Sequence, residues 1–335
     1  IALLLIWVGG KNIDAGSIQV GDMMAFITYT MQIVMSFLFF TFLMMQLPRA
    51  EVAAGRINEV LETEVTVVDS EKIDDSKLQD VKGTLKFDNV SFTFDGADSP
   101  VLSNISFEAE AGKTTAIIGS TGSGKSTLLH LIPRYFDASE GEISIDGVNI
   151  RDISLNKLRD ILGFVPQKGI LFSGNIESNI KFADENITDE QMRKAAEIAQ
   201  AMEFINEKED KFNSEISQGG SNVSGGQKQR LSIARALAKN PKILLFDDSF
   251  SALDYKTDVK LRKTLREEMA GVTTIIVAQR IATILNADKI IVMNEGKIVG
   301  VGKHQELLET CPTYLEIAES QLSEEELQKG GKHHG

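Results

Sequence analysis

Residues Thr115–Leu129 read TAIIGSTGSGKSTLL, and this stretch decides how the rest of the chain is interpreted. The apolar run Ala116–Ile118 predicts a buried strand, and the chain then passes through a glycine-rich turn into an apolar helix that begins near Lys125. The spacing Gly-x-x-x-x-Gly-Lys-Ser, from Gly119 to Ser126, is that of a phosphate-binding loop. Its glycines allow successive amides to point at an anion, and the helix N-terminus adds a positive dipole.

Two side chains of this P-loop have distinct predicted roles. We expect Lys125 to contact the β- and γ-phosphates as a mobile cation and the Ser126 hydroxyl to ligate Mg²⁺. The predicted nucleotide-binding set also includes Gly119, Ser120, Thr121, Gly122, Ser123, Gly124 and Thr127. This motif alone indicates a nucleoside triphosphate and leaves the family of P-loop protein open.

Composition and charge narrow the class of protein. The 335 residues are enough for about two domains, and a net charge of −13 without a basic stripe argues against a nucleic-acid partner. Cys311 is the single cysteine, so no intrachain disulfide can form, which suits a reducing cytosol. The four histidines lack the spacing of a metal site that we would trust.

Both ends of the sequence suggest a fragment with an addition. Ile1 lies inside an apolar run without an initiator Met, so Ile1–Val8 is interpreted as the end of a membrane helix whose start is missing. Lys329–Gly335, KGGKHHG, resembles a cloning scar with part of a tag and is left out of the fold.

A complete membrane-spanning helix is predicted next. Gly9-Gly10 and the polar stretch Lys11–Gln19 are predicted to form a short loop that ends the first helix. Met23–Leu47 then has no charged residue across a length that suits a bilayer. The alternative is a buried helix of a soluble protein, in which such a long uncharged run is rare. Arg49 and Arg56 follow the run, and basic residues indicate the cytoplasmic side. The chain should therefore cross from outside to inside.

This predicted helix carries a polar strip. Gln32 and Ser36 are four residues apart and therefore share one face. A polar strip within a membrane helix faces other helices or a water-filled path. Helix packing and a substrate pathway both remain open.

After the membrane segment, strands alternate with helices. The predicted elements are an amphipathic helix at Pro48–Glu64, an acidic linker at Val65–Asp80, a β-rich stretch from Gly83, a hairpin at Ile143–Ile150, a helical insertion at Asn175–Ser214, and strands at Ile243–Phe246 and Thr274–Val277. This order indicates a mostly parallel sheet with helices on both faces.

Two further motifs accompany the P-loop. Val223-Ser-Gly-Gly-Gln227 precedes a predicted helix at Lys228–Ala238 and fits a second anion-binding helix terminus. Asp247 ends the buried strand, where its carboxylate suits Mg²⁺ held through water.

The three motifs, in this order, resemble the ATP-binding cassette of ABC transporters, and the upstream helix resembles the last transmembrane helix of ABC exporters. The resemblance covers nearly the whole chain. It implies ATP and Mg²⁺ as cofactors and an α/β fold: a P-loop ABC nucleotide-binding domain, with a mixed sheet and a helical subdomain, preceded by a truncated all-α transmembrane domain. The predicted parts are a transmembrane fragment at 1–48, a helix extension and linker at 49–82, the ATP-binding domain at 83–320 with its helical subdomain at about 168–240, and an acidic tail at 321–335.

The resemblance also implies roles for individual residues. Phe94 falls where an aromatic ring stacks on adenine, although Tyr is commoner there. Gln167 resembles the Q-loop glutamine near Mg²⁺ and the γ-phosphate, and Ser251–Asp254 resembles the D-loop. The signature motif corresponds to Ser224, Gly225, Gly226 and Gln227, preceded by Val223 instead of the usual Leu. In this family two cassettes meet head to tail, so this signature would serve a nucleotide held by a partner.

Three positions depart from the family pattern. Asp248 replaces the usual catalytic Glu and is one methylene shorter, and Gln279 replaces the usual switch His and cannot carry a proton. Gln218, before the signature, stands where exporters usually have Glu. The binding residues Lys125, Ser126 and Asp247 remain, so the pattern resembles the degenerate site of heterodimeric multidrug-type ABC exporters.

These features predict an ATP-binding subunit of an ATP-driven exporter in the plasma membrane, with its ATP-binding domain in the cytoplasm. It should bind ATP, hydrolyse it poorly, and pair with a second, non-identical half-transporter to export a small amphiphilic substrate. The alternatives are a homodimeric exporter with weak ATPase activity, a regulatory ABC subunit that transports nothing, and a soluble cassette protein of DNA repair or translation.

Overall fold

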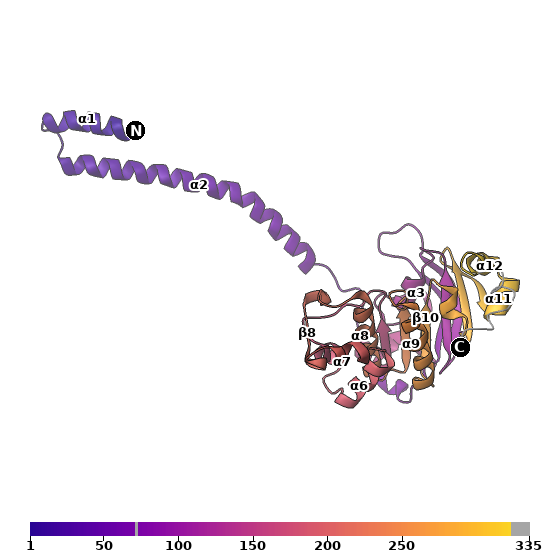
Figure 1. The fold of residues 1–335 in the computed structure, drawn as a ribbon. Helices are drawn as coiled ribbons and strands as arrows, with labels where there is room; N and C mark the ends of the chain where they lie inside the picture. The colour runs from indigo at the N-terminus through magenta and orange to yellow at the C-terminus, as the bar shows by residue number, and fades with distance from the viewer. Residues whose placement is uncertain (71–72, 323–335) are drawn as a thin grey trace. The chain divides into compact units, whose positions relative to one another are not determined.

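The computed structural model describes residues 1–70 and 73–322 (Figure 1). It divides into two compact units, Ile1–Val65 and a second unit that begins at Thr66. Most of the predicted acidic tail and all of Lys329–Gly335 lie outside the described residues.

The first unit consists of two helices, α1 at Ala2–Asp14 and α2 at Val20–Leu61. Helix α2 is 42 residues long, has a mean hydropathy of 1.7, and is the one helix in the described ranges that is long and apolar enough to cross a membrane. The predicted spanning segment and the predicted amphipathic helix are therefore one continuous element. Pro48 lies inside it, where one backbone hydrogen bond is lost.

The predicted loop after α1 begins too early. Helix α1 continues past Gly9 and ends at Asp14, so the connection is confined to Ala15–Gln19. A side chain at Gly9 would lie 2.8 Å from Met23 Cγ, too close for a real contact. Gly9 therefore permits close packing of two apolar helices, as small residues do in membranes, and does not end the helix.

The second unit is built on two main sheets. The six-stranded sheet has the order β12-β11-β3-β10-β9-β6, with β12 antiparallel to β11 and the other pairs parallel. Its strands are β3 at Thr114–Gly119, β6 at Leu162–Val165, β9 at Ile243–Asp247, β10 at Thr273–Val277, β11 at Lys289–Asn294 and β12 at Lys297–Gly302. The predicted α/β class with a mixed sheet is confirmed.

An antiparallel sheet has the order β2-β1-β4-β5, and a two-stranded sheet pairs β7 with β8. The strands are β1 at Leu85–Phe92, β2 at Leu102–Ala109, β4 at Glu140–Ile145, β5 at Val148–Asn149, β7 at Gly174–Asn175 and β8 at Glu215–Ile216. The predicted hairpin is the β4–β5 pair, whose turn residues Asp146 and Gly147 both have positive φ. Such a turn matches the twist of the paired strands.

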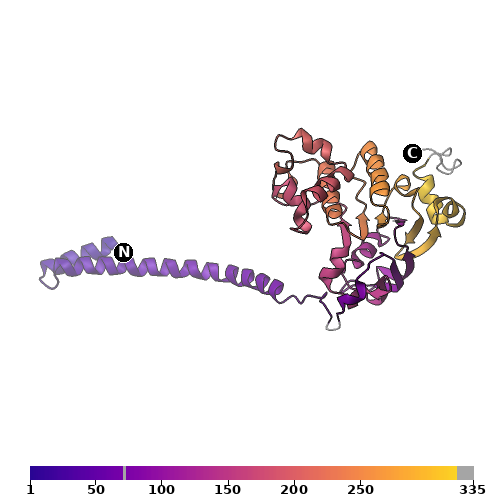
Figure 2. The same ribbon diagram turned by 90° about the horizontal axis from the view of Figure 1, so that it is seen from below.

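Helices surround the sheets. They are α3 at Lys125–Leu131, α4 at Leu155–Ile161, α5 at Ile176–Ile180, α6 at Asp189–Ile198, α7 at Met202–Glu207, α8 at Gly225–Ala238, α9 at Tyr255–Glu268, α10 at Ile281–Ile284, α11 at His304–Thr310 and α12 at Pro312–Glu319. Short 3₁₀ turns lie at Asp75–Leu78, Ile150–Asp152, Lys181–Ala183, Lys211–Asn213 and Gln218–Gly220. Figures 1 and 2 show α6 and α7 at one end of the second unit and α11 and α12 at the other.

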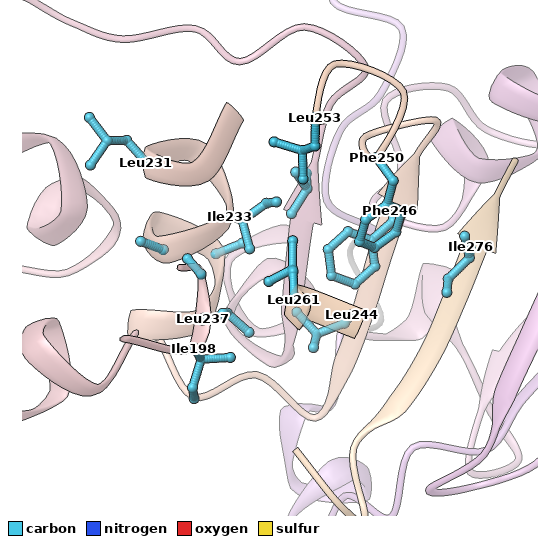
Figure 3. Close-up of a cluster of buried hydrophobic side chains, with 14 of the residues drawn as sticks. Ile198, Leu231, Ile233, Leu237, Leu244, Phe246, Phe250, Leu253, Leu261 and Ile276 are labelled. Atoms are coloured by element: carbon cyan, nitrogen blue, oxygen red, sulfur yellow. The ribbon is translucent and has the colours of Figure 1, made fainter. Parts of the chain in front are cut away.

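The parallel strands of the central sheet are buried on both faces, so the apolar core consists of two clusters, one on each face. Along β9, Leu244 and Phe246 belong to one apolar cluster, and Ile243 and Leu245 to the other. Figure 3 shows Phe246 and Leu244 facing side chains of α8 and α9, such as Leu261. The helical subdomain is therefore joined to the central sheet by a continuous apolar layer.

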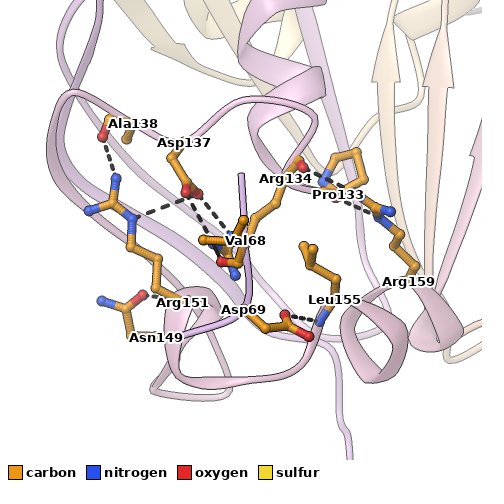
Figure 4. Close-up of polar contacts among 10 residues, drawn as sticks. All are labelled: Val68, Asp69, Pro133, Arg134, Asp137, Ala138, Asn149, Arg151, Leu155 and Arg159. Atoms are coloured by element: carbon orange, nitrogen blue, oxygen red, sulfur yellow. Dashed lines mark hydrogen bonds and ion pairs between the residues drawn. The ribbon is translucent and has the colours of Figure 1, made fainter. Parts of the chain in front are cut away.

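Within the second unit, the acidic linker is hydrogen-bonded to the domain that follows it. The Arg134 guanidinium donates to the Val68 carbonyl at 3.1 Å, and the Asp69 carboxylate accepts the Leu155 backbone amide at 2.8 Å (Figure 4). Arg134 is buried and has a φ of 52°. The linker carboxylates thus act as hydrogen-bond acceptors for the domain that follows them.

We predict that Phe246→Ala lowers the free energy of unfolding by about 3–5 kcal/mol, because it leaves a cavity in a side-chain site with no solvent exposure. The exposed Tyr255 provides the control, and Tyr255→Ala should change stability by less than about 0.5 kcal/mol. Guanidinium unfolding in detergent, followed by circular dichroism, measures both. Equal midpoints for the two variants would contradict the assignment of Phe246 to the core.

Candidate nucleotide-binding site

The P-loop connects β3 to α3, and its backbone requires glycine at specific positions. Gly122 and Gly124 have φ values of 82° and 91°, in the left-handed region that side chains disfavour. A Cβ at Gly119 would lie 2.1 Å from the Met293 carbonyl oxygen, so the end of β3 can approach β11 only without a side chain. The backbone course of this loop therefore depends on glycine at these three positions.

Lys125 is buried and held by this loop. Its Nζ donates to the carbonyl oxygens of Gly119 at 3.0 Å and Ser120 at 2.7 Å. Burial lowers the pKa of Lys125, while the negative charges of Asp248 and Asp247 act in the opposite direction. Within the described ranges no carboxylate forms an ion pair with Lys125. A phosphate anion in the loop would supply the missing countercharge.

Ser126 and Asp247 form the candidate Mg²⁺ site. The Ser126 hydroxyl donates to Asp247 Oδ1 at 2.8 Å, and Asp247 is buried at the end of β9. Residues 1–70 and 73–322 contain no group of three or more His, Cys, Asp and Glu side chains that could hold a metal. One hydroxyl and one carboxylate suit Mg²⁺, which takes oxygen ligands and completes its shell with water and phosphate. The two side chains therefore fit the ion.

Asp248 is the residue on which the other polar groups of the site converge. Its Oδ2 accepts hydrogen bonds from Gln279 Nε2 at 2.8 Å and Gln167 Nε2 at 3.2 Å. Its backbone has a φ of 46°, and its amide donates to the Val277 carbonyl at 2.9 Å. Burial raises the pKa of the Asp248 carboxyl, and the hydrogen bond from Gln167 partly offsets this. The carboxylate is thus held by two amides in a nearly buried site.

The predicted adenine-contacting residue lies in an aromatic cluster. Phe94 is 39% exposed, and its ring packs edge-to-face with Phe92 at 4.8 Å and with Phe136 at 5.3 Å between centroids. Phe136 was missed by the sequence interpretation, although its place soon after the P-loop helix was a usable signal. An exposed ring with a supported edge can stack on a planar base.

His130 is a second residue that the sequence interpretation missed. It lies on α3, and its Nε2 is 3.7 Å from Asp247 Oδ2. The signal was its position five residues after Lys125, one and a half helical turns along α3.

The signature residues form a satisfied helix cap. The Ser224 side chain accepts the Gln227 backbone amide at 3.2 Å, and Gln227 Oε1 accepts the Ser224 amide at 3.1 Å. Helix α8 begins at Gly225, three residues earlier than predicted, because this capping box defines its first turn. Ser224 and Gly225 are exposed, and in the described part of the chain no hydrogen bond or ion pair joins Ser224–Gln227 to the P-loop.

Comparison with known proteins finds one matching family and several similar proteins. The family described as ABC transporter matches residues 102–251. An uncharacterized ABC transporter ATP-binding protein of Mycobacterium tuberculosis is 44% identical over 325 residues, covering 96% of this chain and 55% of that protein. The ATP-dependent lipid A-core flippase of Desulfotalea psychrophila is 38% identical over 304 residues, covering 91% of this chain and 52% of the flippase.

A solved structure is also similar. A bacterial Atm1-family ABC exporter with ATP bound has a TM-score of 0.76 and 34% sequence identity, covering 92% of this chain and 54% of that one. The chain spans about half the length of the curated relatives it matches.

We predict that Lys125→Ala weakens Mg-ATP binding by about 10- to 100-fold, because it removes charge-assisted hydrogen bonds to phosphate. Lys113→Ala is the matched control, since Lys113 lies just before β3 and pairs with Glu110 at the surface. Fluorescence titration with a labelled ATP analogue measures both affinities. Equal weakening by the two substitutions would contradict the assigned role of Lys125.

Proposed function

We propose that this chain, whose residues 102–251 match the ABC transporter family, is part of an exporter-type half-transporter that binds Mg-ATP but hydrolyses it poorly. In this proposal a second, non-identical half-transporter provides the site that hydrolyses ATP efficiently. The observation that carries the proposal is the environment of Asp248, whose carboxylate accepts hydrogen bonds from the amides of Gln167 and Gln279.

Binding of ATP is supported by the residues that remain. Lys125 is held by the P-loop with no carboxylate partner among the described residues, and Ser126 and Asp247 present oxygen atoms for Mg²⁺. Bound Mg²⁺ would neutralise phosphate charge at this position. Phe94 offers an exposed ring for adenine. These groups orient the nucleotide, and they need no general base to do so.

Weak hydrolysis is supported by the length and the contacts of Asp248. A general base must lie within about 2.6–3.2 Å of the water that it deprotonates. Aspartate is one methylene shorter than glutamate, and a misplacement of about 1 Å can cost roughly a hundredfold in rate. The Gln279 amide donates to Asp248 Oδ2, and unlike histidine it cannot take up a proton. The shorter carboxylate at Asp248 and the loss of a protonatable group at Gln279 both weaken the activation of the attacking water.

A partner subunit is supported by the signature residues. Ser224 and Gly225 are exposed at the N-terminus of α8, where the helix dipole favours an anion. They make no contact with this chain's P-loop among the hydrogen bonds and ion pairs of the described residues. We infer that they complete a nucleotide site on the partner.

Membrane insertion is supported by α2. Its length and hydropathy suit a bilayer, and by the positive-inside rule Arg49 and Arg56 favour a cytoplasmic position for the domain that follows. The protein would therefore reside in the cell membrane. The polar pair Gln32 and Ser36 lies within the uncharged segment Met23–Leu47 of this helix, which suits a small amphiphilic substrate or a contact with other helices.

We predict that the double variant Asp248→Glu, Gln279→His raises ATP hydrolysis at this chain's own site by about a hundredfold, because it restores the reach of the base and a protonatable switch. The measurement is ATPase activity of the assembled pair in which the partner's own site has been inactivated. Asp160→Glu is the control, because it makes the same exchange at an exposed ion pair with Lys239.

The outcomes separate the alternatives. Unchanged hydrolysis in the double variant would contradict the degenerate-site proposal. A native mass with one subunit species would favour a homodimer, and ATP binding without substrate flux in vesicles would favour a regulatory subunit.

A further inference from the structure

The turn that carries Gln279 is held from outside by a residue that follows helix α12. Gln279 and Arg280 connect β10 to the short helix α10, and both residues are exposed. We call Gln279–Ile281 the switch turn. The Gln279 side chain donates to Asp248, so the position of this turn decides whether that hydrogen bond forms.

A single side chain bonds both ends of the switch turn. Gln321 Nε2 donates to the Gln279 carbonyl oxygen at 2.8 Å, and Gln321 Oε1 accepts the Ile281 backbone amide at 2.8 Å. Within the described ranges, Arg280, the N-cap residue of α10, makes no capping hydrogen bond with its own side chain. Gln321 therefore supplies a cap that the local sequence lacks, from 40 residues further along the chain.

Helix α12 gives Gln321 a fixed base. Tyr314 and Ala318 of this helix have no solvent exposure, and they belong to the same apolar cluster as Ile281 and Ile284 of α10. Gln321 follows the helix at the exposed margin of this packed layer. Its amide group therefore meets the switch turn from a backbone that the core holds in place.

The other end of α10 is held separately. Arg262 of α9 donates from Nη1 to the carbonyl oxygens of Ala282 at 3.0 Å and Thr283 at 3.4 Å. Its Nε and Nη2 donate to the Asp258 carboxylate at 2.8 and 2.9 Å. Loss of the Gln321 side chain should therefore release Gln279 without displacing the rest of α10.

Gln279 lies at the terminal-phosphate end of the candidate nucleotide site. Its partner Asp248 follows Asp247 of the candidate Mg²⁺ site, and the negative charge of Asp248 acts on Lys125. The lysine of a P-loop contacts the β- and γ-phosphates. ADP has no γ-phosphate, so a displaced Gln279 should affect the binding of a triphosphate more than that of a diphosphate.

We propose that Gln321 is a positioning residue that sets Gln279 against Asp248 and thereby helps the site to distinguish ATP from ADP. The inference rests on the proposed function, because it concerns a nucleotide held at this chain's own P-loop. It extends the nucleotide site to a residue beyond α12, which contacts only the backbone of the switch turn in the hydrogen bonds described above.

Nucleotide affinity of the full chain in detergent tests this inference. The probes are ADP and the β,γ-imido analogue of ATP, each with Mg²⁺ and each competing with a labelled nucleotide. The analogue is not hydrolysed, so turnover does not enter the measurement. In Gln321→Ala the affinity for the ATP analogue should fall by about fivefold, the effect of roughly one hydrogen bond, and the affinity for ADP should change by less than about twofold.

Two further variants locate the effect. Ser320→Ala is the matched control, because Ser320 precedes Gln321 and its hydroxyl donates to the Ile317 carbonyl of α12. This control should leave both affinities unchanged. Adding Gln321→Ala to a chain that already carries Gln279→Ala should cause no further loss, because Gln321 acts through Gln279 and the two effects are then not additive.

Three results would overturn the inference. They are unchanged affinities in Gln321→Ala, equal weakening of both nucleotides in that variant, and a full fivefold loss when Gln321→Ala is added to Gln279→Ala. A wild-type chain that binds neither nucleotide would contradict the proposed function, and the inference with it. Failure of the inference alone is therefore seen only in the variants.

Discussion

The hydrogen bonds from two glutamine amides to the carboxylate of Asp248 are the interaction on which the rest of this account depends. Gln279 lies 2.8 Å and Gln167 3.2 Å from the same oxygen, Oδ2. A carboxylate in a site that excludes water needs such donors, because burial alone raises its pKa. Side-chain amides satisfy it without taking a proton, and on this ground we propose that the arrangement supports nucleotide binding more than proton transfer.

The fold supplies this convergence through neighbouring parallel strands. β3, β10 and β9 lie side by side, and their carboxyl ends deliver Gly119, Gln279 and Asp247 to one edge of the sheet. Ligands of open α/β sheets bind at that edge. The apolar layers on both faces hold the strands in register, because each strand alternates its side chains between two clusters. The apolar packing on the two faces of the sheet therefore sets the distances between the polar side chains at its carboxyl edge.

Much of the fold and part of the candidate site could be predicted from local sequence patterns. The P-loop, the carboxylate of Asp247 at the end of β9 and the α/β class depend on short spacings and on alternation of strands and helices, which the sequence displays directly. The identification of Asp248 and Gln279 as departures came from a family resemblance. Their hydrogen bond joins residues 31 positions apart, and that of Gln167 to Asp248 joins residues 81 apart, so no spacing rule could provide either.

The predictions from the sequence that the structure corrects also failed for physical reasons. A pair of glycines was interpreted as a helix end, but Gly9 serves close packing against Met23. The start of α8 was placed at Lys228, because Ser224–Gln227 were interpreted as residues that precede the helix, whereas their capping box forms its first turn. Phe136 and His130 follow the P-loop closely in the sequence, but they were missed because the side-chain contacts that bring them to the site are made only in the fold.

The most direct test is the fate of a single nucleotide. The chain is assembled with a partner whose P-loop lysine has been replaced, so that ATP binds only at Lys125, and the bound nucleotide is extracted and separated over time. We expect stoichiometric ATP that remains largely uncleaved over many turnovers of the intact pair. Rapid conversion of that ATP to ADP would contradict the central claim that Asp248 holds its site in a binding state and not a hydrolysing one.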